Sequence, residues 1–187
     1  MREEGRGRRA PLALLVGFGV FLVAMGYLVA ASLTRRTAPA YAPTPVGRVR
    51  PAAWERHGDT ITVDARDTER WRYVSLTRGR VLSGPDTAGW EVAARRYNLI
   101  ANGDVVDLGV ARFDSVARAP RALEANSSTV GRWYRYSLLT HLLEPTGHVY
   151  VVRTTPGRLF KLEIVSYYCP GLTAGCMTIR YAPLPPE

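Results

Sequence analysis

The chain has 187 residues, and its 25 lysines and arginines outnumber 16 aspartates and glutamates, which gives a formal net charge of +9. The basic residues are scattered along the sequence and form no single patch, which argues against a nucleic-acid-binding protein. The sequence contains no G-x-S-x-G, P-loop, H-E-x-x-H or EF-hand spacing. We therefore expect a protein that is not an enzyme and that has no metal site.

The uncharged segment between Arg9 and Arg35 is the first predicted element. At about 1.5 Å per residue, a helix of this length spans roughly 36 Å, which exceeds the ~30 Å hydrocarbon core of a bilayer. We expect a short cytoplasmic leader at 1–10 and one transmembrane helix at 11–34. A cleavable signal peptide, processed near residues 38–40, is the alternative, although apolar regions of signal peptides are usually only about 7–15 residues long.

Three glycines, Gly17, Gly19 and Gly26, lie within the predicted membrane helix. Small residues let a second helix approach closely, so these glycines are candidates for helix packing, although glycine is also common in membrane helices without that role. The very short leader and the long domain after the helix favour an N-terminus inside the cell. The predicted location is the bacterial inner (cytoplasmic) membrane, with a periplasmic or extracytoplasmic C-terminal domain.

A proline-rich segment follows at 35–50, with prolines at 39, 43 and 45. This composition is typical of an extended, semi-rigid spacer. The remaining residues, 51–187, are enough for one domain with one core. Short β-branched and aromatic runs alternate there with turn sequences. This pattern predicts an all-β fold, either an antiparallel sandwich or a partly open barrel, and argues against βαβ units.

Three turn sequences separate the predicted strands. The Asn-Gly pair at 102–103 is the strongest hairpin signal, and Pro-Gly at 156–157 is the second. The third is the loop between Cys169 and Cys176, which contains Pro-Gly. A cysteine pair with this spacing can close a hairpin as a disulfide in an oxidising compartment, and two free thiols are the alternative.

Four motifs follow one another in the β region: WRYVSL at 71–76, WEVAARRYNLIANGD at 90–104, YVVRTTPGRLFKLEIVSYY at 150–168 and TIRY at 178–181. In this order they resemble the HmuY family, extracytoplasmic β-rich proteins whose best-known members bind haem. The chain departs from the family pattern at Glu91, where aspartate is expected, and it lacks a phenylalanine after the alanines at 93–94. The retained membrane anchor that we expect is a further departure. The resemblance implies a HmuY-like antiparallel sandwich or partly open barrel.

The resemblance also implies haem as a ligand, held by two axial histidines or methionines. His141 precedes the YVVRT motif, near the position expected of one ligand, and His148 lies seven residues further along. The region expected to supply the second ligand, 113–130, contains neither histidine nor methionine. A short loop brings two imidazole rings beside one another more readily than onto opposite faces of a porphyrin. The sequence therefore does not support a bis-histidine pocket.

Two functions remain open at this point. The first is a non-enzymatic, single-pass subunit whose extracytoplasmic β domain braces or docks partner subunits in a membrane protein complex, for example a respiratory or photosynthetic one. It needs no cofactor, and the basic domain would also be attracted to anionic membrane lipids. The second is a haem- or small-ligand-binding protein of the HmuY type at the outer face of the membrane, with His141 and His148 as candidate ligands.

Overall fold

The structure is a computed structural model that divides into two compact units, Met1–Thr37 and Ala38–Glu187, and each is described by itself. The predicted leader at 1–10 lies outside the described residues. The structure describes residues 12–33, 38–45, 48, 58–84, 89–120, 127–138, 140–154 and 157–185.

The described part of the first unit is a single helix, α1 (Leu12–Leu33), within the predicted span 11–34. It carries no charged side chain and is long and apolar enough to cross a membrane, which fits both an anchor and a signal sequence. A Cβ added to Gly17, Gly19 or Gly26 would meet no atom within 4 Å. Packing of these glycines against another helix therefore stays a prediction.

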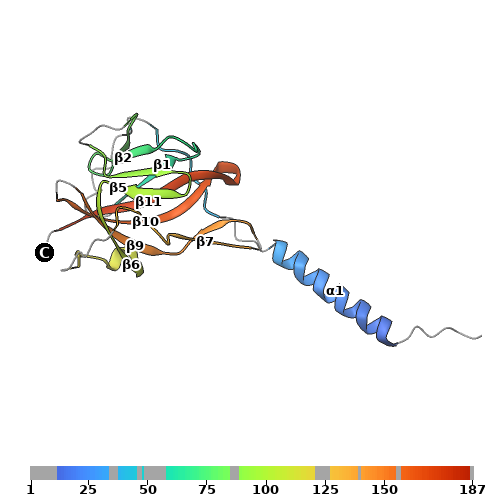
Figure 1. Ribbon diagram of the computed structural model, residues 1–187. Helices are drawn as coiled ribbons and strands as arrows, with labels where there is room; N and C mark the ends of the chain where they lie inside the picture. Colours follow the sequence, from blue (N-terminus) through green and yellow to red (C-terminus); the bar gives the residue numbers. More distant parts are fainter. Residues whose placement is uncertain are drawn as a thin grey trace, which may run out of the picture. The chain divides into compact units, whose positions relative to one another are not determined.

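The second unit consists of antiparallel strands in three sheets (Figure 1), which confirms the predicted all-β class. The five-stranded sheet has the order β1 (Asp59–Asp64), β11 (Thr173–Leu184), β10 (Leu159–Cys169), β9 (His148–Thr154) and β6 (Gly103–Val110). The four-stranded sheet has the order β3 (Arg80–Val81), β2 (Arg72–Ser75), β4 (Val92–Arg95) and β5 (Asn98–Ala101). A separate hairpin joins β7 (Tyr134–Tyr136) to β8 (Leu143–Pro145), and two 3-10 turns are η1 (Phe113–Ser115) and η2 (Pro170–Leu172).

The main core lies between the five-stranded and the four-stranded sheet. Every second residue of β11, namely Met177, Ile179 and Tyr181, belongs to it, as expected for a strand whose successive side chains point to opposite faces. The four-stranded sheet contributes fully buried side chains from β2, β4 and β5: Val74, Val92, Ala94 and Leu99. Burying a side chain of this size is worth about 1.5–3 kcal/mol, so this layer holds the two sheets together.

The hairpin of β10 and β11 confirms the predicted turn at the cysteine loop. The turn η2 contains Gly171 with φ of 78°, a left-handed conformation that glycine adopts without steric cost. Cys169 and Cys176 face each other across the base of the turn and form a disulfide. The strands on either side of the predicted turn at 156–157, β9 and β10, are paired; Gly157 is described, and Pro156 lies outside the described residues.

The Asn-Gly pair at 102–103 does not form the predicted hairpin. β5 pairs with β4, whereas β6 pairs with β9, so the chain crosses here from one sheet to the other. Glycine is needed because a Cβ on Gly103 would lie 2.0 Å from the carbonyl oxygen of Arg153. The prediction of a sharp turn at glycine was right, and the pairing of the flanking strands was wrong because β5 already pairs with β4, the strand just before it, and β6 pairs with the distant β9.

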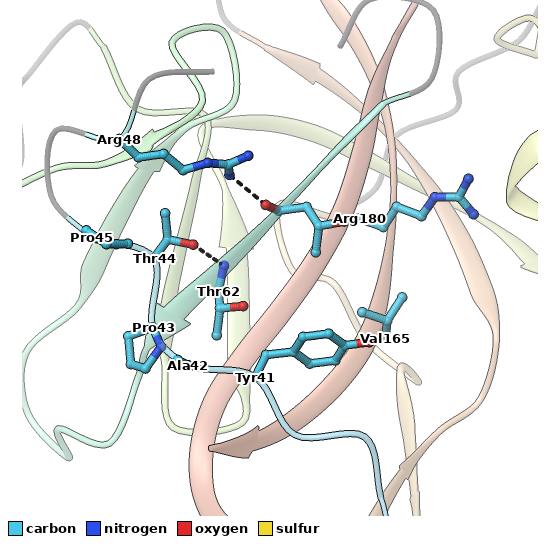
Figure 2. Close-up of a pocket in the computed structure, with 10 residues that line it drawn as sticks. Tyr41, Ala42, Pro43, Thr44, Pro45, Arg48, Thr62, Val165 and Arg180 are labelled. Atoms are coloured by element: carbon cyan, nitrogen blue, oxygen red, sulfur yellow. Dashed lines mark hydrogen bonds between the residues drawn. The ribbon is translucent and has the colours of Figure 1, made fainter. Parts of the chain in front are cut away.

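Part of the predicted spacer belongs to the β unit. Residues 38–45, called the strap below, lie along the five-stranded sheet (Figure 2). The Tyr41 N–H donates to the Tyr168 carbonyl oxygen at 2.9 Å, and the Thr44 N–H donates to the Thr62 carbonyl oxygen at 2.8 Å. The Thr62 N–H donates in turn to the Thr44 hydroxyl at 2.8 Å. The compact unit begins at Ala38 because this extended segment finds partners for its backbone groups on the sheet.

Candidate functional site

His141 lies in the loop between β7 and β8, and its side chain is exposed. Its φ of 56° is in the left-handed region, which is uncommon for residues other than glycine and concentrates at functional positions. The imidazole Nδ1 lies 2.6 Å from the hydroxyl oxygen of Tyr136. Among the described residues, the other ring nitrogen, Nε2, has no hydrogen-bond partner. His141 therefore presents an oriented imidazole with one nitrogen available.

The loop is held by contacts at the base of the hairpin. The Leu143 N–H donates to the Tyr168 hydroxyl oxygen at 2.7 Å, which ties β8 to β10. On the other strand, the Trp133 indole N–H donates to the Tyr97 carbonyl oxygen at 2.9 Å, and its ring packs against Tyr167 at 5.7 Å between centroids. These contacts fix a two-stranded hairpin that would be marginal in isolation.

His148 lies in a different environment, at the start of β9. Its Nδ1 is 2.9 and 3.0 Å from the two carboxylate oxygens of Asp107, and only 17% of its side chain is exposed. The two histidines therefore differ in exposure and in hydrogen-bond partner, and His141 is the more accessible of the two.

The other histidine and the methionine that follow the predicted membrane helix are His57 and Met177. Met177 is fully buried in the main core, and His57 lies outside the described residues. Within the part of the chain that the structure describes, no three histidine, cysteine, aspartate or glutamate side chains are grouped so that they would hold a metal ion. The described side chains fit a haem with one axial imidazole, from His141.

A charged cluster occupies the face of the five-stranded sheet that is turned away from the main core. The Lys161 ammonium donates to two carbonyl oxygens of the η1 segment at 2.9 and 2.8 Å, and the Arg180 guanidinium bonds Asp114 at 2.6 Å and Glu163 at 3.4 Å. Burial lowers the pKa of Lys161. Burial also raises the pKa of Glu163, an effect that the neighbouring Arg180 partly offsets. Each charged group has partners, which indicates a structural role in fastening η1.

An open groove of about 650 Å³ lies between the strap and the sheet (Figure 2). Its two arginines are already paired, Arg48 with Asp59 at 2.6 Å and Arg180 with Asp114 at 2.6 Å. It contains no histidine, methionine or cysteine. Among its described lining residues, the groove therefore offers iron no nitrogen or sulfur ligand, and the Tyr41 phenol is the one group of a type that binds haem iron in other proteins. Its lining residues are Tyr41, Ala42, Pro43, Thr44, Pro45, Arg48, Thr60, Thr62, Val165 and Arg180.

Solved structures share this architecture. An HmuY analogue of Tannerella forsythia, in its apo form, aligns with a TM-score of 0.57 and 15% identity, over 68% of this chain and 96% of that chain. The β unit has the HmuY fold. An HmuY-like protein of Bacteroides vulgatus named for haem binding also aligns (TM-score 0.54, 18% identity, 73% of this chain and 97% of that one).

A third neighbour is a Bacteroides fragilis protein named as a lipoprotein, with a TM-score of 0.53 and 19% identity over 71% of this chain and 93% of that one. No family model and no curated protein matches the sequence. Identities this low establish the fold alone.

Two features of the site were absent from the sequence predictions. One is Tyr136, which contacts the imidazole of His141 from five residues upstream. An aromatic residue shortly before a histidine across a tight loop is the only sequence signal for it, and that signal is weak. The other is the strap, whose prolines indicated an extended segment without indicating what it contacts.

Proposed function

We propose that this protein is a non-enzymatic ligand-binding protein of the HmuY type, and that it binds haem through one axial ligand, His141. The observation that carries the proposal is the exposed imidazole whose Nδ1 contacts the Tyr136 hydroxyl and whose Nε2 has no partner among the described residues. Haem iron is bound by a single proximal histidine in several protein classes, so one protein ligand is sufficient. When bound, haem supplies the iron centre that accepts this nitrogen.

The contact with Tyr136 supports a ligand role for His141. Histidines that bind metals usually hydrogen-bond through the nitrogen that is not coordinated, which fixes the tautomer and the ring orientation. A proton on Nδ1, shared with the Tyr136 oxygen, leaves the lone pair on Nε2. Beside it, Tyr136 and Leu138 are 51% and 79% exposed and offer apolar surface to a flat ligand. His148 has a partner of the same kind, the Asp107 carboxylate at its Nδ1, but only 17% of its side chain is exposed, so its imidazole is less accessible to a haem.

The proposed setting is the outer face of the bacterial inner membrane, with α1 retained as the anchor. The length and apolar composition of α1 support this placement. The other candidate function, a brace for partner subunits in a membrane complex, has no supporting observation among the described residues. That function would be indicated by partner proteins that copurify with the chain in fixed stoichiometry from native membranes in mild detergent.

The test is a hemin titration of the full chain in mild detergent, followed through the Soret band. We expect saturation at one haem per chain, loss of the shifted Soret band in His141→Ala, and an approximately tenfold weaker affinity in Tyr136→Phe, in line with the usual effect of removing a ligand's hydrogen-bond partner. His148→Ala is the matched control and should bind as the wild type does. Equal binding by the wild type and His141→Ala would overturn the proposal, and loss of binding in His148→Ala would exclude a single-ligand site.

A further inference from the structure

The large apolar side chains that the β unit leaves exposed are concentrated at one end. Among the described residues of this unit, only Val110 lies elsewhere. The five others come from four separate segments, the strap, the β4–β5 turn, the β7–β8 hairpin and η2, so no single loop accounts for them. This set is called the apolar end below: Tyr41 (40% exposed), Tyr97 (45%), Tyr136 (51%), Leu138 (79%) and Leu172 (43%).

Tyr168, near the end of β10, connects three of these segments. Its carbonyl oxygen accepts the N–H of Tyr41 in the strap, and its hydroxyl oxygen accepts the N–H of Leu143 at the base of the β7–β8 hairpin. η2, which carries Leu172, begins two residues after Tyr168. In Figure 1, β7 and the turn between β10 and β11 lie on the same side of the β unit.

The β4–β5 turn is joined to the same end through the last residues of β1. The Ala65 N–H donates to the Gly175 carbonyl oxygen in β11, next to the disulfide, and the Ala65 carbonyl oxygen accepts the N–H of Arg96. Tyr97 follows Arg96 and packs edge to face against Tyr134 of β7, with ring centroids 6.0 Å apart. All four segments therefore meet at one end of the unit.

The charges at this end favour an anionic surface. Asp64 is paired with Arg66 at 2.7 Å, and Glu144 is paired with Arg135 at 2.9 Å, so both carboxylates are neutralised. Arg96 is exposed, and among the described residues its guanidinium has no ion pair. The apolar end thus combines tyrosine and leucine side chains with one exposed arginine that, among the described residues, has no ion pair.

The chain itself indicates which surface lies nearby. α1 ends at Leu33 and the strap begins at Ala38, so only residues 34–37, two of them arginines, connect them. At full extension the five Cα–Cα steps from Leu33 to Ala38 span about 18 Å. If α1 spans a bilayer, the strap therefore starts close to the headgroups. Tyrosines with an apolar body and a polar tip, together with arginines, are the side chains that concentrate at membrane–water interfaces.

We infer that the apolar end docks on the bilayer surface, with Tyr136 and Leu138 in the interface and Arg96 against anionic headgroups. The lipid surface is preferred over a partner protein because the exposed side chains come from four loops around one end, and a fluid interface accommodates them without a matching shape. This inference depends on a retained anchor and does not depend on the binding of haem.

The experiment uses the full chain in phosphatidylcholine vesicles, with or without phosphatidylglycerol, and without hemin. Leu138→Cys is labelled with an environment-sensitive fluorophore, and Val110→Cys serves as the matched control because the two side chains are 79% and 75% exposed. The native cysteines are bonded to each other, so the added thiol is the one that reacts. Quenching of the fluorophore by a nitroxide attached to the lipid headgroup reports how close the labelled side chain lies to the headgroups.

We expect severalfold stronger quenching at position 138 than at position 110, a further increase with phosphatidylglycerol, and loss of that increase in Arg96→Gln. Equal quenching at both positions would overturn the inference. Protection of position 138 that grows with the ratio of protein to lipid would overturn it in favour of a second copy of the chain. Haem binding is measured in detergent without vesicles, so a failure of either experiment leaves the other proposal intact.

Discussion

The two faces of the five-stranded sheet are buried by different means. Thr178 and Ile179 are neighbours on β11 and both are 0% exposed, yet they point to opposite faces. Ile179 lies in the apolar core against the four-stranded sheet. The Thr178 hydroxyl lies 3.1 Å from the Thr62 hydroxyl, on the face that bears the strap groove. On its outer face the strand is polar at Thr178 and Arg180, whereas further along Ala182 and Leu184 belong to two small apolar clusters.

The difference follows from what covers each face. The inner face is covered by a regular sheet, whose backbone groups bond within their own ladder, so its side chains need no polar partners. The outer face is covered by the strap and the η1 segment, which lack such ladders. Lys161 therefore donates to η1 carbonyl oxygens, and Thr62 bonds the strap. Polar residues at buried positions of the outer face replace the hydrogen bonds that a second sheet would provide.

The largest effect is expected on the inner face. Ile179→Ala should lower the free energy of unfolding by about 2–5 kcal/mol, because it leaves a cavity in a layer that is closed on all sides. Urea unfolding of the full chain in mild detergent, followed by tryptophan fluorescence, measures the loss. Val110→Ala, at a side chain 75% exposed, is the control and should stay within about 0.5 kcal/mol of the wild type. Equal losses for both variants would show that the inner face is not the core.

A smaller effect is expected on the outer face. Thr178→Val keeps the side-chain shape and removes a buried hydroxyl, which leaves the Thr62 hydroxyl without this partner, so we expect a loss of about 1 kcal/mol in the same unfolding assay. The Thr62→Val and Thr178→Val changes combined should cost less than the sum of the two single changes, because the second removes the orphaned group. Strict additivity would contradict a direct hydrogen bond between them.

The smallest effect concerns Glu163 and depends on pH. Its pKa is raised by burial in the folded state, so between pH 4.5 and that raised pKa the folded chain binds more protons than the unfolded chain. This contribution to stability falls as pH rises through that window. The glutamine in Glu163→Gln cannot ionise, so the variant does not lose this contribution as pH rises. The difference in free energy of unfolding between the variant and the wild type should therefore shift in favour of the variant by under about 1 kcal/mol from pH 4 to pH 7. Unfolding midpoints at each pH test this.

Glu144→Gln, on the β7–β8 hairpin, is the matched control for the removal of one acidic group. If Glu163→Gln instead lost stability steadily towards neutral pH, the ion pair with Arg180 at 3.4 Å would outweigh the burial of the carboxylate. That result would make the outer face an ion-pair layer and would sharpen its contrast with the inner face.

Local sequence patterns predicted those parts of the fold that local chemistry decides. The apolar run predicted α1, and the turns at 156–157 and at the cysteine loop lie between paired strands because the flanking strands are also neighbours in space. The glycine at 103 was recognised as a turn, but the strands on either side of it have other partners: β5 pairs with the adjacent β4 around residues 96–97, and β6 pairs with the distant β9. Sheet order therefore had to come from the structure.

The candidate site was also predicted only in part from the sequence. His141 was predicted from its place before a motif, whereas its contact with Tyr136 depends on a left-handed backbone conformation that the sequence does not signal. The difference in exposure between His141 and His148 could not be predicted from their positions in the sequence. The strap was missed because a proline-rich segment looks the same in sequence whether it is solvated or hydrogen-bonded to a sheet.

The strap also constrains the order of events during biogenesis. A protease that processed the chain near residues 38–40 would need this segment extended in its own active site. In the folded unit Ala40 is bridged to Tyr168 and the Ser166 hydroxyl donates to the Pro39 carbonyl oxygen. Once the β unit has folded, these contacts withhold the peptide bonds from cleavage. Cleavage at that position would have to precede folding, and a chain that folds first would keep α1 attached.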